Sequence, residues 1–388
     1  MLTFKNFSGI NNVLHTSRLG ESDLAVALNV DFGLTGEASR RSGYMRIDAD
    51  AHTNLFQTAG FSLATIGING DLTNLESGAV LYPSLGHNRI WYVALPDGRV
   101  AFSNELIAGV SNGAQTTKLG VPIPTSVGAL TEIAGDLYPG EYQWQITYSR
   151  QSDGKEGGPA YSQPEKVSTG GIFLSGLPVA PGYRINVYLT SHNGGPAFYA
   201  GSTENGLFSF IGNNSALVQP CRTDFMEPAP AGRCLTSWRG RVLVAKGSVL
   251  YASRPNGWED FDIRRDFKQF EAAITAVVPV DDGLYVGTET ELAFLSGSTW
   301  DTLSYRRVLD GRVVLGSGLP VSGDLIKQGD GVGSGNAMMC IAGGGLVAGF
   351  NGGGVIRMTE GRYHTDAVEV FSAFRAVNGV PQYVGVMR

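Results

Sequence analysis

The stretch of sequence that decides the fold reads WRGRVLVAKGSVLYASRPNGWEDF, Trp238–Phe261. Within it, Val242, Val244 and Leu250 alternate with polar or small residues. The segment Lys-Gly-Ser at 246–248 separates the two apolar runs and supplies a reversal of the chain. Alternation on both sides of a short glycine-containing turn predicts a β-hairpin.

The same pattern returns about forty residues later, at the spacing of propeller repeats. There the sequence reads AVVPVDDGLYVGTETELAFLSG, Ala276–Gly297. Asp282-Gly283 and the segment 288–291 separate runs rich in Val, Leu, Tyr and Phe. A repeat of this length that contains only hairpins is typical of the blades of a β-propeller. The sequence therefore predicts an all-β fold built on a β-propeller.

The composition of the whole chain agrees with many short strands. Its 388 residues include 54 glycines and 17 prolines, and only 16% are charged. Glycine supplies the positive φ angles that tight turns need. No apolar run approaches the ~20 residues that cross a bilayer, and the N-terminus lacks the hydrophobic stretch of a signal peptide. We therefore expect synthesis in a cytoplasm and no membrane contact.

Charge and cysteine content exclude two further classes of protein. The net charge is −6 and is spread along the chain, so no segment is a basic platform for nucleic acid. Cys221, Cys234 and Cys340 fit neither a disulfide framework nor a CxxC metal site. We expect three buried thiols, although a pair between Cys221 and Cys234 stays open.

A different module interrupts the propeller pattern after the proline-containing linker GVPIP, Gly120–Pro124. Its first long strand places aromatic or apolar side chains at strict period two: Tyr142, Trp144, Ile146 and Tyr148. A later strand does the same with Ile185, Val187 and Leu189. This module, 126–218, resembles a fibronectin type III-like β-sandwich inserted into the propeller.

The resulting domain plan has three parts. Residues 1–125 form the first part of the propeller, 126–218 the inserted sandwich, and 219–388 the second part of the propeller. About 295 residues outside the sandwich, at ~40–50 per blade, predict about six blades, with five to seven open. Closure of the ring hides exposed sheet edges, so we expect the N-terminal strands to complete a blade with the final strand at 382–386.

No motif indicates a reaction, a cofactor or a metal. The five histidines have no ligand spacing, and the glycine triplets 343–345 and 352–354 lack the GK[ST] ending of a phosphate loop. Asp281-Asp282-Gly283 is better interpreted as a hairpin turn than as a calcium loop. We therefore predict that the chain is not an enzyme and has no catalytic, cofactor-binding or metal-binding residues.

The nearest approach to a pair of glycosidase carboxylates is Asp260 and Asp262, in the segment WEDFDIRRDF. Such pairs cannot be judged by spacing along the chain, because they form between distant parts of a fold. The neighbouring Arg264 and Arg265 offer a simpler explanation. We expect these two carboxylates to form ion pairs with those arginines or to cap turns.

Four segments together resemble a family of bacteriophage virion proteins. They are FKNFSGINNV at 4–13, ALNVDFGLTGEASRRSGY at 27–44, and the two propeller stretches quoted above. The family comprises tail hub or nozzle proteins, mostly of short-tailed phages, with a β-propeller domain. The resemblance implies a structural virion protein that forms the nozzle ring at the distal part of the tail and lines the DNA ejection channel.

The resemblance also implies partners and a location. The chain would form a homo-hexamer ring beneath a tail adaptor or tube protein, with tail fibre or spike proteins as further neighbours. DNA would be passing cargo, and a mildly acidic surface would repel its phosphates. The protein would reside in the virion tail after synthesis in the host cytoplasm.

Two alternatives stay open beside the tail role. The first is a carbohydrate-binding adhesin or receptor-binding component of the tail, because propellers and sandwiches both carry sugar sites. The second is a propeller glycosidase or lyase, which needs two or more carboxylates that converge at the central channel.

Overall fold

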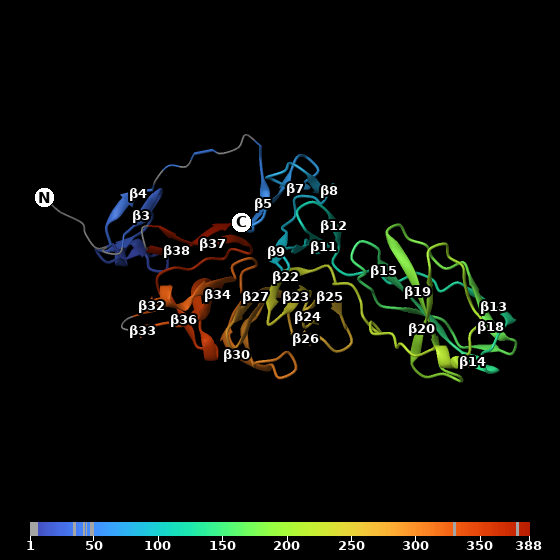
Figure 1. Ribbon diagram of the computed structural model, residues 1–388. Coiled ribbons are helices and arrows are strands. Elements are labelled where there is room, and N and C mark those ends of the chain that lie inside the picture. The colour runs from blue at the N-terminus through green and yellow to red at the C-terminus, as the bar shows by residue number, and fades with distance from the viewer. Residues whose placement is uncertain are drawn as a thin grey trace.

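The computed structural model describes residues 7–33, 36–41, 43, 45–46, 50–328, 331–377 and 380–388. Short antiparallel sheets make up nearly all of the regular structure. Figure 1 shows a larger body of sheets with a second unit, around β13–β20, attached at one end. The described helices are single 3-10 turns: η1 (Thr16–Arg18), η2 (Asn214–Ala216), η3 (Gly323–Leu325) and η4 (Asn351–Gly353).

Five antiparallel sheets follow one another along the chain as the complete blades of a β-propeller. Blade 1 contains β5 (Thr53–Gln57), β6 (Ser62–Ile66), β7 (Asp71–Asn74) and β8 (Val80–Tyr82). Blade 2 contains β9 (Trp91–Ala94), β10 (Val100–Ser103), β11 (Ala108–Ser111) and β12 (Thr116–Lys118). Blade 3 contains β22 (Arg233–Trp238), β23 (Arg241–Lys246), β24 (Val249–Arg254), β25 (Gly257–Phe261) and β26 (Phe267–Gln269).

Two more complete blades and a two-stranded sixth follow. Blade 4 contains β27 (Ile274–Val280), β28 (Gly283–Thr288), β29 (Glu291–Ser296) and β30 (Ser304–Asp310). Blade 5 contains β31 (Leu319–Ser322), β34 (Asn336–Ala342), β35 (Gly345–Gly349) and β36 (Val355–Arg357), with a side hairpin of β32 (Lys327–Gln328) and β33 (Gly331–Val332). The sixth sheet is the hairpin of β37 (Val370–Val377) and β38 (Val380–Met387). The structure thus confirms the propeller and gives five complete blades and a partial sixth.

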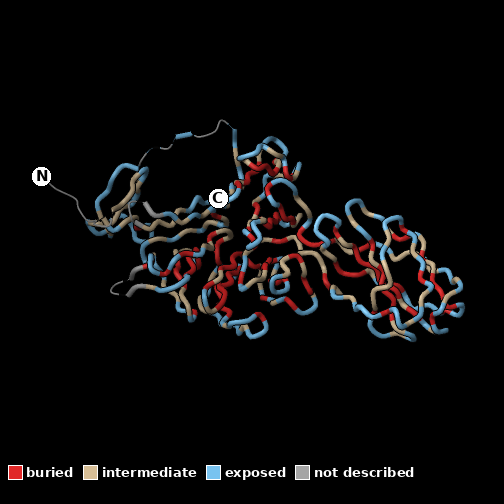
Figure 2. Tube along the Cα trace, in the orientation of Figure 1, coloured by how far each residue is buried: buried red, intermediate tan, exposed pale blue. Residues whose placement is uncertain are grey.

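Separate apolar clusters fill the spaces between consecutive blades. Strand β23 shows how one strand serves two clusters. Val242 and Val244 pack toward blade 2. Leu243 and Ala245, which alternate with them along the strand, pack toward blade 4. A strand buried on both faces needs a continuous apolar run, which explains the sequence VLVA. The buried residues accordingly concentrate between the sheets (Figure 2).

The hairpins predicted from the two deciding stretches are confirmed. Strands β23 and β24 pair up to Lys246 opposite Val249, with the turn at Gly247 and Ser248. Strands β27 and β28 pair up to Val280 opposite Gly283. The segment 296–337, which carries no clear blade pattern, contributes β30 to blade 4 and β31 to blade 5.

Ring closure differs from the prediction. The final strand β38 pairs with β37, while the described N-terminal strands pair among themselves: β1 (Gly9–Ile10) with β2 (Asp23–Leu24), and β3 (Val30–Phe32) with β4 (Ala38–Arg40). For the described strands, the expectation that N-terminal strands complete a blade with the final strand is therefore wrong. A partner two residues away costs far less loop-closure entropy than one more than 300 residues away. The expected turn at Asn378-Gly379 lies outside the described residues.

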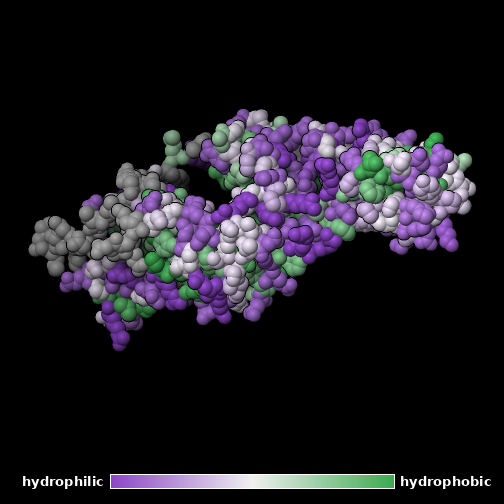
Figure 3. All heavy atoms as spheres, turned by 60° about the horizontal axis from the view of Figure 1, so that its bottom comes forward, coloured by the Kyte–Doolittle hydropathy of each residue, from purple (hydrophilic) through white to green (hydrophobic). Residues whose placement is uncertain are grey.

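The inserted unit is a sandwich of antiparallel sheets. Its strands are β13 (Ala129–Ala134), β14 (Gly140–Tyr142), β15 (Trp144–Arg150), β16 (Ala160–Tyr161), β17 (Glu165–Val167), β18 (Gly170–Ser175), β19 (Tyr183–Thr190), β20 (Ala197–Thr203) and β21 (Phe208–Phe210). The sheet β13-β18-β21 and the sheet β16-β15-β19-β20 enclose one apolar core. That core contains the predicted alternating residues of 142–148 and 185–189. The surface seen in Figure 3 is mainly hydrophilic, with separate apolar patches on the propeller half and on the sandwich.

Candidate functional site: the domain joint and the propeller centre

The two chain segments that connect the propeller to the sandwich run side by side. The Ala229 N–H donates to the Leu119 carbonyl at 2.8 Å. Glu227 and Phe261 of β25 exchange two backbone hydrogen bonds, at 2.8 and 3.1 Å. Gly120 fits tightly between these segments, since a Cβ there would lie 2.5 Å from the Pro228 Cα. The joint is therefore a packed layer and not a free linker.

A buried carboxylate lies at the centre of this joint. Glu259 of β25 is 4% exposed and accepts hydrogen bonds from Arg99 Nη1 at 2.6 Å and Arg150 Nη2 at 2.5 Å. The Gly120 N–H donates to the same carboxylate at 3.3 Å. Arg99 follows the loop between β9 and β10, whereas Arg150 ends β15 of the sandwich. One carboxylate thus binds a guanidinium from each domain.

The electrostatics of this group favour the charged form of Glu259. Burial alone would raise its pKa, but the hydrogen bonds and charges of Arg150 and Arg99 outweigh burial and lower the pKa below its usual value. Arg150 is itself only 4% exposed and also donates to Asp153 at 2.8 Å. Breaking a buried pair of this kind leaves an uncompensated charge, which costs several kcal/mol, about 3–5.

A second ion pair crosses the joint beside the first. Lys155 Nζ lies 2.5 Å from Asp260 Oδ2. The prediction that Asp260 pairs with Arg264 or Arg265 is therefore wrong. Its partner is Lys155 of the sandwich. For Asp262 the expectation is confirmed, because Arg264 donates to it at 3.0 and 3.1 Å.

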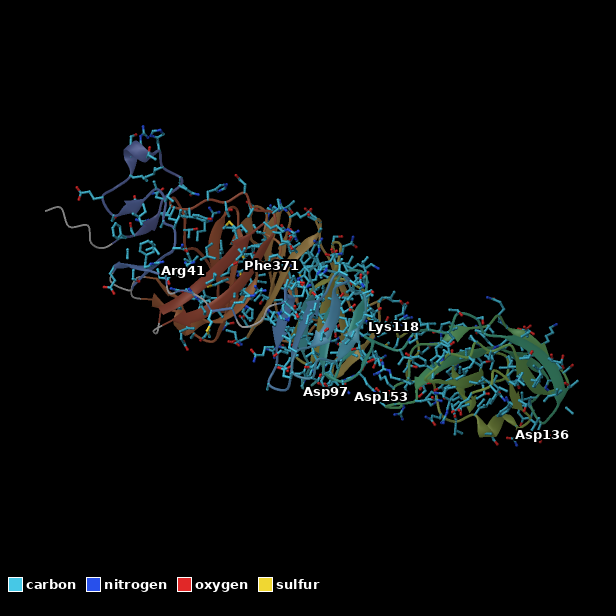
Figure 4. The ribbon with its side chains drawn as sticks, turned by 90° about the horizontal axis from the view of Figure 1, so that it is seen from above. Arg41, Asp97, Lys118, Asp136, Asp153 and Phe371 are labelled. Atoms are coloured by element: carbon cyan, nitrogen blue, oxygen red, sulfur yellow. The ribbon has the colours of Figure 1, made fainter. Side chains whose placement is uncertain are left out.

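A surface cleft of about 420 Å³ opens where the two domains meet. Figure 4 shows Asp97 on the propeller side and Asp153 on the sandwich side of this junction, with Lys118 nearby. Asp97 accepts a hydrogen bond from Arg99 at 2.7 Å. The walls of the cleft are thus the outer members of the ion network, and their charges largely cancel.

A second arginine, the partly buried Arg89, lies near the first strands of several blades. Arg89 precedes β9, and its Nη2 donates to the Val370 carbonyl at 2.6 Å. Its Nε lies 3.0 Å from Glu369 Oε1, and its guanidinium stacks 4.0 Å from the centre of the Phe371 ring. These contacts tie the segment between blades 1 and 2 to the sixth sheet.

The backbone next to Arg89 admits only glycine. Gly316 has φ +77°, and a Cβ there would lie 1.5 Å from Arg89 Nη1. The remaining space, lined by residues of β5, β9, β31 and β37, is a pocket of about 260 Å³. That volume cannot admit a DNA duplex, whose major groove alone is about 12 Å wide.

The candidates weighed from the sequence occupy structural positions. Asp281 accepts hydrogen bonds from Asn336 and Asn351, and Asp282 accepts one from the Gly352 N–H, so the Asp-Asp-Gly turn joins blades 4 and 5. Among the described residues, no group of three His, Cys, Asp or Glu side chains could hold a metal ion. None of the described helices is long and apolar enough to span a bilayer.

The thiols are free, and the pair considered between Cys221 and Cys234 is not formed. Cys234 and Cys340 are buried, and burial raises the pKa of each thiol to about 12. Cys221 is only half-buried, which corrects the expectation of three buried thiols.

Sequence reasoning missed the two arginine sites. Glu259 lies in an aromatic-rich strand end, and Arg150 ends a strand whose other residues are mostly buried. A charged residue inside or directly after an apolar run is a weak signal for a buried ion pair. The identity of the partner has no local signal, because Glu259 binds residues 160 and 109 positions away.

Comparison with known proteins assigns no family. No model of a protein family matches the sequence, and no curated protein is similar to it. The chain is similar to the BBS1N domain crystallised with ARL6DN, at 12% identity and TM-score 0.31, over 87% of this chain and 91% of that one. It is also similar to Saccharomyces cerevisiae Sqt1, at 8% identity and TM-score 0.27, over 73% of this chain and 63% of that one. A third similar structure is the computationally designed Ika8 protein, at 10% identity and TM-score 0.26, over 87% of this chain and 97% of that one. TM-scores this low carry no functional argument.

Proposed function

We propose that the chain is a structural component of a bacteriophage tail, a nozzle or hub protein whose copies form a ring around the DNA ejection channel. The resemblance of the four quoted segments to this family is the origin of the proposal. In this role the propeller is a wall element, the sandwich projects from it, and the DNA passes between copies.

The observation that best supports this role is the buried Glu259 joint. A wall element under pressure from packaged DNA needs domains that do not rotate against each other. Glu259 binds Arg99 of the propeller and Arg150 of the sandwich while almost fully buried, so the two domains have one fixed orientation.

Charge supports the same role. The net charge of −6 weakens any attraction to DNA phosphates, which a channel wall must release. The ring would be a homo-hexamer beneath the tail adaptor or tube protein, and the sandwich would contact a neighbouring tail protein such as a fibre or spike.

Native mass spectrometry of the purified chain, alone and with the adaptor ring of the same phage, tests this proposal. The expected result is six copies bound to the adaptor ring. A chain that stays monomeric and does not bind the adaptor would contradict it.

A carbohydrate-binding role at the tail is a second candidate, favoured by one surface feature of the sandwich. Tyr138 is 63% exposed and meets the ring of His192 edge-on at 6.1 Å, next to the polar Asn193 and Glu141. An exposed aromatic ring beside polar groups is a suitable platform for a sugar ring. Glycan-array binding that is lost in Tyr138→Ala would support this role, whereas no binding by the wild-type chain would reject it.

A further inference from the structure

Residues 7–46, here called the N-terminal arm, lack a core of their own. Among the described residues of the arm, only Asn11 is buried. Two small two-stranded sheets, β1–β2 and β3–β4, provide its regular structure. Figure 1 shows β3 and β4 at the periphery of the propeller, beside β38 and away from β5, where the chain enters blade 1. An arm without a core depends on a surface outside itself for its order.

That surface is the loop 359–366, which precedes the sixth sheet. Asn12 pairs with it as a strand would: the Asn12 N–H donates to the Arg362 carbonyl at 2.9 Å, and Asn12 Nδ2 donates to the His364 carbonyl at 2.8 Å. The His364 N–H returns a bond to Asn12 Oδ1 at 2.8 Å. Arg362 adds a bond to the Ser8 carbonyl at 2.8 Å and lies 3.6 Å from Asp23. The hydrogen bonds and the ion pair give this seat a specific geometry.

The seat within one chain leaves a large part of the arm's apolar surface in water. Val26, Leu28 and Met45 are 67%, 80% and 86% exposed. Close to the seat, Val368 and, in β38, Val386 are 52% and 65% exposed as well. Covering apolar surface gains about 25 cal/mol per Å². The exposed apolar side chains of the arm and those beside the seat belong to the same chain. The arm of a second copy can therefore cover the side chains beside the seat, and those side chains can cover the arm.

The length of the connection permits such an exchange. Arg46 ends the arm and Thr53 begins β5 seven residues later, so the connection spans roughly 25 Å at most when extended. The arm can therefore seat on a body that abuts its own. Exchange of an identical element between copies is a low-cost route to assembly. The arm makes the same contacts whether it binds its own chain or a neighbouring copy.

We propose that the arm of each copy seats on the 359–366 loop and sixth sheet of the neighbouring copy, and that this exchange links the copies into the ring. The inference rests on the proposed tail role, which supplies the ring. The occupant is a second copy of this chain, and the apolar side chains of arm and sixth sheet are covered between the two bodies.

Cross-linking between two tagged forms of the full chain tests the exchange. One form carries Val13→Cys and the other Glu360→Cys, because Val13 and Glu360 line the same surface pocket of about 350 Å³ at the seat. Both forms carry Cys221→Ser, which removes the half-buried native thiol. The two forms are co-expressed and treated with a flexible bismaleimide. The expected product joins two differently tagged chains, and a form carrying both cysteines gives a ladder up to six chains.

The Asn12→Ala substitution should lower the yield of the two-chain product about tenfold or more, because two hydrogen bonds of the seat are lost. Thr16→Ala, an exposed arm residue away from the seat, is the matched control and should leave the yield unchanged. The exchange is overturned if the chain with both introduced cysteines gives only cross-links within single chains. It is also overturned if no cross-linked product forms. If native mass spectrometry finds six copies but all cross-links lie within single chains, the arm exchange is rejected and the proposed ring stands. If the chain is a monomer, both the arm exchange and the ring are rejected.

Discussion

Two buried charges, Glu259 and Arg150, and the half-buried Arg99 determine how the domains are held. Glu259 lies between Arg99 and Arg150 with hydrogen bonds of 2.6 and 2.5 Å. Each of these groups would be costly to bury alone. Together they form a joint that depends on geometry, because the carboxylate must face both guanidinium groups at once. The stability of the joint therefore depends on single residues to an unusual degree.

Glu259→Gln should lower the free energy of unfolding by up to about 3–5 kcal/mol, because the buried Arg150 loses its buried counter-charge and keeps only the more exposed Asp153. Thermal and denaturant unfolding measure the change. Glu204→Gln is the control, since Glu204 pairs with Arg184 at the surface, with both side chains more than half exposed, and should cost at most about 1 kcal/mol. Equal effects of the two substitutions would contradict the buried joint.

The same substitution predicts a dependence on pH. The pKa of Glu259 is lowered in the folded chain, so its contribution is complete above its unfolded pKa, about 4.3, and is lost as the pH falls through the folded value. The difference in melting temperature between wild type and Glu259→Gln should be constant near neutral pH and shrink below pH ~4. A difference that grows on acidification would contradict this.

Gly316→Ala should destabilise the propeller more than an ordinary glycine replacement. Gly67 is the control, because its φ of +76° matches the +77° of Gly316 while nothing lies within 4 Å of its Cβ position. Gly67→Ala should cost about 1–2 kcal/mol from backbone strain alone. Gly316→Ala adds the displacement of Arg89 from the Val370 carbonyl. Equal unfolding free energies for the two variants would show that Arg89 does not occupy this position.

At the level of elements, period-two alternation and turn residues identified most hairpins. The run Val242–Ala245 and the turn at Gly247 determine β23 and β24 by local chemistry alone. Closure of the ring and the partner of Asp260 could not be predicted, because both depend on which distant segments the fold brings together. Lys155 is 105 residues from Asp260, and no local pattern marks that distance.

The sandwich should be removable as a unit. Its core is separate from the clusters between the blades, and its two connections are hydrogen-bonded at Leu119 and Ala229. Replacing residues 123–225 with a short Gly-Ser linker should leave a folded propeller with a cooperative transition and native-like circular dichroism. Loss of all cooperative unfolding would show that the propeller needs the sandwich to fold.

For the whole molecule, the account requires a surface that does not retain DNA. With a net charge of −6, the purified chain should bind duplex DNA more weakly than ordinary non-specific binders, with a Kd above about 10⁻⁴ M at physiological salt. Gel shift or fluorescence anisotropy measures this. Micromolar binding with a steep salt dependence would indicate a basic contact surface and would contradict a passive channel wall.

The central claim is that copies of this propeller form the wall of the distal tail channel. Cryo-EM reconstruction of the phage tail tests it most directly. We expect six copies of the propeller with its sandwich, arranged around an open channel below the adaptor or tube. A tail whose distal ring contains no such body, or a chain located only in peripheral fibres, would contradict it.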